Sequence, residues 1–185
     1  GEPHRIKPSE LATRRAMHRP WGVADPGHWA SEAASERGTG PVGEIWYDRP
    51  GTPASSPALL LKVLLTSAPL SIQVHPDDEH ARSIGLPNGK SEAWHVLSAT
   101  PDARIALGLK QSMTAQQLRT AALDGSIADA VAWKSVANDD TIMVPAGTIH
   151  AIGAGLVIAE IQQRSDTTFR LFDHGRNREL QGELA

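Results

Sequence analysis

Polar side chains that can bind a metal ion stand close together in the stretch Ser71–Pro76. Gln73 and His75 are separated by one residue, and on an extended strand such positions face the same side while Val74 faces the other. An amide oxygen and an imidazole nitrogen that converge from one strand can act as two ligands of a divalent ion. The alternative is a buried polar pair whose hydrogen bonds are satisfied within the fold, and this stretch alone does not separate the two.

A second polar stretch, Gly89–Trp94, places a cation beside another potential ligand. It contains the Gly-Lys-Ser with which phosphate-binding loops end, but the preceding Gly85 is one position too close and the following residues are typical of a strand rather than a helix. A phosphate-binding loop is therefore excluded. Lys90 and Glu92 remain, two positions apart on one face of the expected strand, and a surface salt bridge is the alternative for such a pair.

The stretch Val144–His150 adds a second histidine. A proline and a glycine in it predict a tight turn, with His150 at the head of the next strand. This P-x-G-x-x-H pattern resembles the second motif of cupins, which are small β-barrels that hold a metal inside. The sequence Gln73-Val74-His75, followed after a long insertion by Glu92, resembles the first cupin motif. Both motifs are present in the cupin order, which favours a metal site built from the two.

Further motifs identify a narrower resemblance, to the type I mannose-6-phosphate isomerases of the short bacterial kind. It covers roughly residues 20–178, which is most of the chain. The motifs that carry it lie in the family's order along the chain: Pro20-Trp21-Gly22, Gly43–Trp46, Leu61–Leu64, Ser71–Asp78, Gly89–Trp94, Ile158–Gln163, Ser165–Asp173 and Gly175-Arg176.

The resemblance implies a metal-dependent aldose–ketose isomerase of carbohydrate metabolism, which interconverts mannose 6-phosphate and fructose 6-phosphate through an enediol. It implies a Zn²⁺ ion, although oxygen and imidazole donors also suit Mn²⁺, Co²⁺ or Fe²⁺. The metal ligands implied are Gln73, His75, Glu92 and His150.

The resemblance also implies residues that act on the substrate. Arg170 is expected to stabilise charge near the enediolate or the phosphate, and Asp166 to help proton transfer. One of Lys62 and Lys90 is expected to assist ring opening while the other meets the phosphate. The catalytic residues implied are Arg170, Lys62 and Asp166. From the residues alone, an ion pair of Arg170 with a neighbouring aspartate, Asp166 or Asp173, remains the alternative. The substrate-binding residues implied are Lys90, Glu44, Ser71 and Trp21.

Short strands separated by turns must position these side chains. A helical insertion is predicted around residues 112–133, with Ser112 or Thr114 as its cap, and a further helix is predicted at 9–17. Many short strands predict an all-β fold, which the resemblance specifies as a cupin jelly-roll β-barrel, also called a double-stranded β-helix. Trp46 and Trp94 lie in regular strands and are expected to belong to the core. The predicted strands lie at 43–47, 59–66, 70–75, 92–97, 104–109, 141–144, 149–152, 156–162 and 168–172.

The length of 185 residues corresponds to one domain. We expect a single cupin-type catalytic domain over residues 1–185, in which 1–41 is mostly irregular. The chain stops soon after Arg176, whereas the resemblance implies relatives that continue into a second, smaller C-terminal β-domain, which is expected to be absent here. Missing strands would expose a sheet edge, which is a reason to expect a homodimer or contact with another partner.

The composition excludes several classes of protein. The chain has no cysteine, which excludes thiol chemistry, thiolate metal sites and disulfides and fits a reducing compartment, so we expect a cytoplasmic protein. The formal charge of −3 argues against a nucleic-acid partner. No apolar run approaches the roughly 20 residues of a membrane span, so no membrane association is expected. The expected partner is a small sugar phosphate.

Other functions stay open at this point. One is an isomerase of another sugar phosphate, and one is a non-catalytic, metal-containing cupin that binds sugars or regulates. The presence of all the implied ligands together with Lys62, Lys90 and Arg170 argues against lost turnover, because a degenerate copy would lack several of them. A cupin dioxygenase would use more histidines and fewer lysines.

Overall fold

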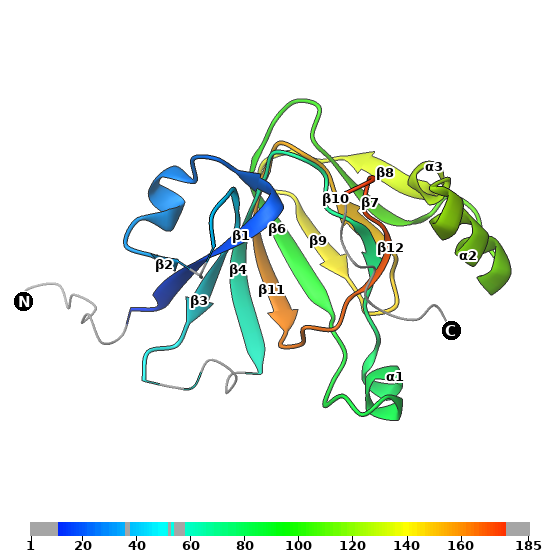
Figure 1. Cartoon of the computed structure of the whole chain (residues 1–185), viewed down its shortest axis with the longest axis horizontal. Coiled ribbons are helices and arrows are strands. Elements are labelled where there is room, and N and C mark those ends of the chain that lie inside the picture. Colours follow the sequence, from blue (N-terminus) through cyan, green and yellow to red (C-terminus); the bar gives the residue numbers. More distant parts are fainter. Residues whose placement is uncertain (1–10, 36–37, 52, 54–57, 177–185) are drawn as a thin grey trace, which may run out of the picture.

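The computed structural model describes residues 11–35, 38–51, 53 and 58–176 of the chain. Two β-sheets make up most of it (Figure 1). The seven-stranded sheet has the order β2-β1-β3-β4-β11-β6-β9, and its neighbouring strands are antiparallel except for β1 and β2. Its strands are β1 (Thr13–Val23), β2 (Ala34–Ser35), β3 (Val42–Asp48), β4 (Leu59–Thr66), β6 (Glu92–Ala99), β9 (Thr141–Val144) and β11 (Leu156–Gln163).

The second sheet has five strands in the order β12-β5-β10-β7-β8, all antiparallel. These strands are β5 (Ile72–Val74), β7 (Arg104–Leu109), β8 (Val131–Ser135), β10 (His150–Ile152) and β12 (Phe169–Phe172). The helical elements are the 3₁₀ helix η2 (Gly27–Ala30), α1 (Asp78–Ser83), α2 (Ala115–Asp124) and α3 (Ile127–Ala130). The all-β prediction is confirmed, and the described residues form two separate sheets rather than one closed barrel.

The core lies between the two sheets. Successive side chains of a strand point to opposite faces, and on β11 the inward positions carry Ile158 and, two residues further, Glu160. Ile158 packs in one apolar cluster with Trp94 of β6 and with Ile105 and Ile152 of the second sheet. Polar side chains on the inward face of the seven-stranded sheet therefore point into the same interior as the apolar core.

The N-terminal segment differs from the prediction. The helix expected at 9–17 is wrong where the structure describes it, because the chain from Thr13 pairs with β3 in a register that joins Met17 to Glu44. Residues 9 and 10 lie outside the described part. Pairing along β3 and the burial of Ala16 outweigh the weak local preference for helix. The segment 1–41, expected to be mostly irregular, thus contains an 11-residue strand.

The helical insertion forms much as expected. Thr114 caps α2: its side chain accepts a hydrogen bond from the backbone N–H of Gln117, and the Gln117 side chain accepts one from the backbone N–H of Thr114, which is a capping box. Gly125 ends the helix at φ +82°. The insertion ends earlier than the predicted residue 133, because Val131 already begins β8 and pairs with β7. Figure 1 shows α2 and α3 at one end of the molecule, beside β8 and β12. Among the described residues, no helix is long and apolar enough to cross a membrane.

Candidate active site

Three buried side chains bring potential metal ligands together. His75 directly follows β5, Glu92 begins β6 and His150 begins β10. One ligand atom from each lies within 4.8 Å of the others. Gln73 stands opposite His150 in the pairing of β5 with β10, so the predicted fourth ligand borders the same cluster. The sequence motifs that carry these four side chains therefore meet at one place.

The hydrogen bonds of the two histidines determine which ring nitrogen is free to bind. The Nδ1 atom of His75 lies 3.1 Å from the carbonyl oxygen of Thr167, and that of His150 lies 2.8 Å from the carbonyl oxygen of Thr148. Because a carbonyl oxygen only accepts, each Nδ1 carries the hydrogen and each Nε2 presents a lone pair. These lone pairs face Glu92, at 3.2 Å from Oε1 for His75 and 3.8 Å from Oε2 for His150.

The charges of this cluster fit a bound cation. Burial lowers the pKa of His75 to about 4 and also lowers the pKa of His150, so both rings are neutral near pH 7. Burial alone would raise the pKa of Glu92, but the nearby Lys90 ammonium acts in the opposite direction, and the net shift of that pKa is downward. Nε2 of His75 is buried without a hydrogen-bond partner among the described residues. The two imidazole lone pairs and the ionised carboxylate of Glu92 repel one another. A divalent ion bound between these three groups would satisfy all of them.

Gln73 would complete this donor set after a turn of its terminal amide. Its Nε2 atom lies 3.4 Å from Nε2 of His150, and its Oε1 accepts a hydrogen bond of 2.9 Å from the Ser71 hydroxyl. A half-turn of the terminal amide directs the oxygen toward the other ligands, and the Ser71 hydroxyl can bond either amide atom. The four side chains together offer oxygen and imidazole donors and no thiolate, as in metal sites that keep a position open for substrate.

Two glycines let the ligand-bearing segments touch. Gly147 adopts φ +84°, and its N–H donates to the carbonyl oxygen of His75 at 2.8 Å, so the turn before His150 is tied to the other histidine. A side chain on Gly89 would lie 2.5 Å from the carbonyl oxygen of Pro76. This close approach brings the segment that carries Lys90 and Glu92 against the segment that follows His75.

A hollow of about 230 Å³ opens beside the cluster, and a smaller one of about 40 Å³ adjoins it and reaches the candidate metal ligands Glu92 and His150. The structure brings all the sequence-predicted substrate residues to the larger hollow. Its lining includes Trp21, Glu44, Lys62, Ser71, Lys90, Asp166 and Arg170.

Lys62 is held between two buried acids. Its Nζ atom lies 3.7 Å from Oε1 of Glu44 and 3.8 Å from Oε1 of Glu160, and 4.9 Å from the centre of the Trp46 ring. Glu44 also accepts hydrogen bonds from Arg19 at 3.0 Å and from the Trp46 indole at 2.8 Å. Burial would raise the pKa of Glu44, but the charges of Lys62 and Arg19 outweigh it and lower that pKa.

Sequence reasoning missed three residues of this site. Arg19 and Trp46 line the larger hollow, although Trp46 was expected to be only core, and Glu160 lines the smaller one. Burial and the charge of Glu92 raise the pKa of Glu160 to about 8, so its carboxyl holds a proton at neutral pH. The available signal was an acid at an inward position of β11 between Ile158 and Gln162, both of which are buried.

Arg170 lies in β12 opposite Gln73 of β5. Asp173, one of the two aspartates considered as its structural partner, accepts hydrogen bonds from Arg176 at 2.6 and 3.1 Å. The other, Asp166, is exposed at the rim of the hollow, next to the residue whose carbonyl orients His75. The positions of Arg170 and Asp166 suit the roles expected of them, and those roles stay predictions.

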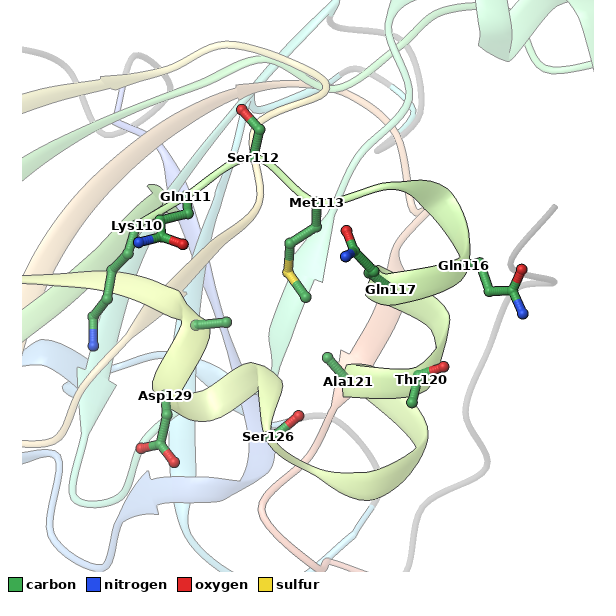
Figure 2. Close-up of a pocket in the computed structure, with 11 residues that line it drawn as sticks. Lys110, Gln111, Ser112, Met113, Gln116, Gln117, Thr120, Ala121, Ser126 and Asp129 are labelled. Carbon is green, nitrogen blue, oxygen red and sulfur yellow. The ribbon is translucent and has the colours of Figure 1, made fainter.

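A larger hollow of about 600 Å³ lies away from these residues, between the helical insertion and the segment that precedes it. Figure 2 shows Met113, Gln117 and Ala121 pointing into it, with Lys110 and Asp129 at one side. Among the described residues that line it, Asp129 is the single carboxylate and there is no histidine. It therefore offers no cluster of groups for acid–base or metal chemistry.

Comparison with known proteins finds relatives of one kind. No protein-family model matches the chain. The chain is 39% identical over 127 residues to mannose-6-phosphate isomerase ManA of Bacillus subtilis (strain 168), an alignment that covers 68% of the chain and 40% of the relative. It is 33% identical over 162 residues to the probable mannose-6-phosphate isomerase GmuF of the same strain, covering 84% of the chain and 51% of the relative. The chain thus spans about half the length of these curated relatives, or less.

A solved structure supports the fold. The crystal structure of the mannose 6-phosphate isomerase from Bacillus subtilis superimposes with a TM-score of 0.75 at 23% identity, covering 91% of this chain and 62% of that one. At this low sequence identity the structural match establishes the architecture and not the chemistry. It confirms the cupin fold that the sequence motifs implied.

Proposed function

Because the chain belongs to the type I mannose-6-phosphate isomerase family of cupins, we propose that it is a metal-dependent aldose–ketose isomerase that interconverts mannose 6-phosphate and fructose 6-phosphate. One observation carries the proposal: two imidazole lone pairs converge on a buried carboxylate beside a cation-lined hollow. The first part is suited to a metal and the second to an anionic substrate.

The reaction moves a proton between C1 and C2 of the open-chain sugar, and its difficult moment is the negative charge that develops on the carbonyl oxygen. A divalent ion on the four ligands would supply Lewis-acid stabilisation of that charge. We propose Zn²⁺ as the resident ion, while Mn²⁺, Co²⁺ and Fe²⁺ suit the same donors.

The chain's own cationic side chains stabilise the other negative charges of the substrate. Arg170 stabilises charge near the enediolate or the phosphate, and its planar group offers several donors to either. Lys62, between its two acids, assists ring opening, while Lys90 meets the phosphate. Asp166, at the rim, helps proton transfer. Glu44 pairs with both Lys62 and Arg19, offsets one of their two positive charges, and holds both at the wall of the hollow.

The proposal extends to the organisation and the location of this chain. The chain forms a single cupin-type catalytic domain that works in the cytoplasm, which the absence of cysteine supports. We expect a homodimer, because β9 lies at the edge of the larger sheet and, among the described strands, pairs only with β6. Light scattering that gives the mass of one chain would contradict the dimer.

The test is direct turnover by metal-loaded protein. Mannose 6-phosphate is supplied, other aldose phosphates are supplied in parallel, and fructose 6-phosphate or the matching ketose phosphate is followed. A chelator is expected to abolish turnover. Arg170→Ala is expected to keep its metal and lose at least about 100-fold in rate, which is the scale of a lost charge stabiliser. Arg82→Ala, at an exposed position of α1, is the matched control and should leave the rate unchanged.

Each result bears on a different part of the proposal. Unchanged turnover in Arg170→Ala would remove that residue from the mechanism. Faster turnover of another aldose phosphate would change the substrate. A metal-loaded protein that turns over none of them would overturn the isomerase and favour the non-catalytic sugar-binding cupin.

A further inference from the structure

The indole of Trp94 contacts two metal ligands without being a ligand itself. Its single N–H lies 3.2 Å from Oε2 of Glu92 and 2.8 Å from Oε2 of Glu160. Its ring meets the ring of His150 edge to face, with centroids 5.6 Å apart. The side chain is only 1% exposed, so bulk water does not compete for that hydrogen. One rigid donor is therefore shared by two buried carboxyl groups.

The strand register makes this arrangement part of a longer row. Trp94 of β6 stands opposite Glu160 of β11, Glu160 opposite Lys62 of β4, and Lys62 opposite Trp46 of β3. These residues occupy directly paired positions on four neighbouring strands and interact with one another across the sheet. Glu92 joins the row from two positions before Trp94 on the same face of β6.

We propose that Trp94 is a positioning residue, whose N–H fixes the carboxylate of Glu92 for metal binding and ties it to Glu160 and hence to Lys62. This inference deepens the isomerase function proposed above and rests on it. Nothing in the chemistry requires Trp94 to touch the substrate.

The second donor beside Glu92 cannot replace the indole. Lys90 approaches the other oxygen, Oε1, at 3.6 Å from Nζ, and its ammonium stands on a flexible chain that also lines the hollow. The indole instead lies in the apolar cluster between the sheets, where Val96 and Ile158 pack in the same cluster. Oε2 of Glu92 is thus oriented by a group that is packed into the core, and the orientation of that carboxylate decides where its lone pairs point.

The experiment compares two tryptophan variants. Trp94→Phe keeps an aromatic ring in the core and removes the N–H, whereas Trp133→Phe removes an N–H that bonds the carbonyl oxygen of Ala128, outside the site. The Zn²⁺ dissociation constant is measured for both and for the wild type by competition with a chromophoric chelator. Partners that orient metal ligands typically contribute 10–100-fold to metal affinity, so we expect that loss for Trp94→Phe and less than about 3-fold for Trp133→Phe. An unchanged constant in Trp94→Phe overturns the proposal.

A measurement on the wild type decides the question even when Trp94→Phe does not fold. The indole N–H resonances are assigned by NMR in ¹⁵N-labelled protein and followed as Zn²⁺ is added. The Trp94 resonance is expected to shift in step with metal binding while the Trp133 resonance stays in place. A Trp94 resonance that does not move overturns the proposal.

Activity separates this inference from the function on which it rests. A wild type that binds Zn²⁺ but isomerises no sugar phosphate contradicts the proposed function, while weaker Zn²⁺ binding by Trp94→Phe still supports the positioning role. A wild type that isomerises, together with a Trp94→Phe variant of unchanged affinity, contradicts the positioning role alone.

Discussion

The free energy of unfolding of the metal-free protein is expected to fall as the pH rises, because of Glu160. The variant Glu160→Gln is expected to lack this pH dependence. Burial and the charge of Glu92 raise the pKa of Glu160 from 4.5 to about 8. The folded state therefore binds this proton more tightly than the unfolded state does. The stability that it contributes is fully present below about pH 4.5 and is lost as the pH rises through 8. Glutamine carries no titratable proton, so the variant lacks this dependence.

The size of the effect follows from the shift. One pKa unit corresponds to 1.36 kcal/mol, so the interval from 4.5 to about 8 amounts to at most about 5 kcal/mol. Even a loss of about 2 kcal/mol would move the Tm of a domain of this size by roughly 4–8 °C. Any fixed cost of the amide beside Lys62 is the same at each pH and cancels when the slopes of the two proteins are compared.

The assay is urea unfolding at a series of pH values from 5 to 9, with a chelator present, followed by tryptophan fluorescence and circular dichroism. The free energy of unfolding of Glu160→Gln, minus that of the wild type, is expected to grow with pH and to level off above pH 8. Glu79→Gln, at an exposed position of α1, is the control and should run parallel to the wild type. Parallel curves for Glu160→Gln would mean that the buried carboxyl is already ionised at pH 5, which would refute the reasoning from burial.

Three further changes have definite expected outcomes. His150→Ala should lose bound metal on dialysis and retain no turnover, as measured by elemental analysis beside the isomerase assay, and full metal content would contradict the ligand set. Lys62→Met leaves Glu44 without one of its buried partners, so urea unfolding should show a loss of about 3–5 kcal/mol, and an unchanged midpoint would mean that Arg19 alone compensates that charge. Gly147→Ala places a side chain at φ +84° with nothing within 4 Å of it, so thermal unfolding should show a backbone cost of about 1–2 kcal/mol, and an unchanged Tm would contradict the left-handed turn.

Local spacing predicted where three of the four candidate ligands lie on their strands, and the family resemblance implied that they bind a metal. Alternation along a strand placed Gln73 and His75 on one face, and the Pro-x-Gly turn placed His150 at the head of a strand, because both rules depend only on neighbouring residues. What spacing could not supply was their convergence with Glu92, which needs two sheets and which the family resemblance provided. The structure brings these groups within ligand distance of one another.

Pairing between distant segments explains what was missed. The N-terminal strand was predicted as a helix because its partner, β3, begins at Val42 and is invisible to local propensity. Trp94 was assigned to the core, and the indole is indeed buried there, but its role beside Glu92 and Glu160 depends on the register of β11 against β6. A register is set by turns and burial along the whole sheet, and a single sequence does not display it.

The row of charged and indole side chains across four strands is also hard to explain as a stabilising device. Removing ions from water costs several kcal/mol for each, and apolar residues of similar volume in such places are often neutral or stabilising. Here the charged Lys62 and Glu92 and the protonated Glu160 are all under 7% exposed, and they lie on the inward face that also holds the apolar core. A fold that needed only cohesion would place aliphatic side chains at these positions. The desolvation cost of these charges is offset only if they act on a bound ion or substrate. The converging candidate ligands beside the hollow are the place where such a group would bind.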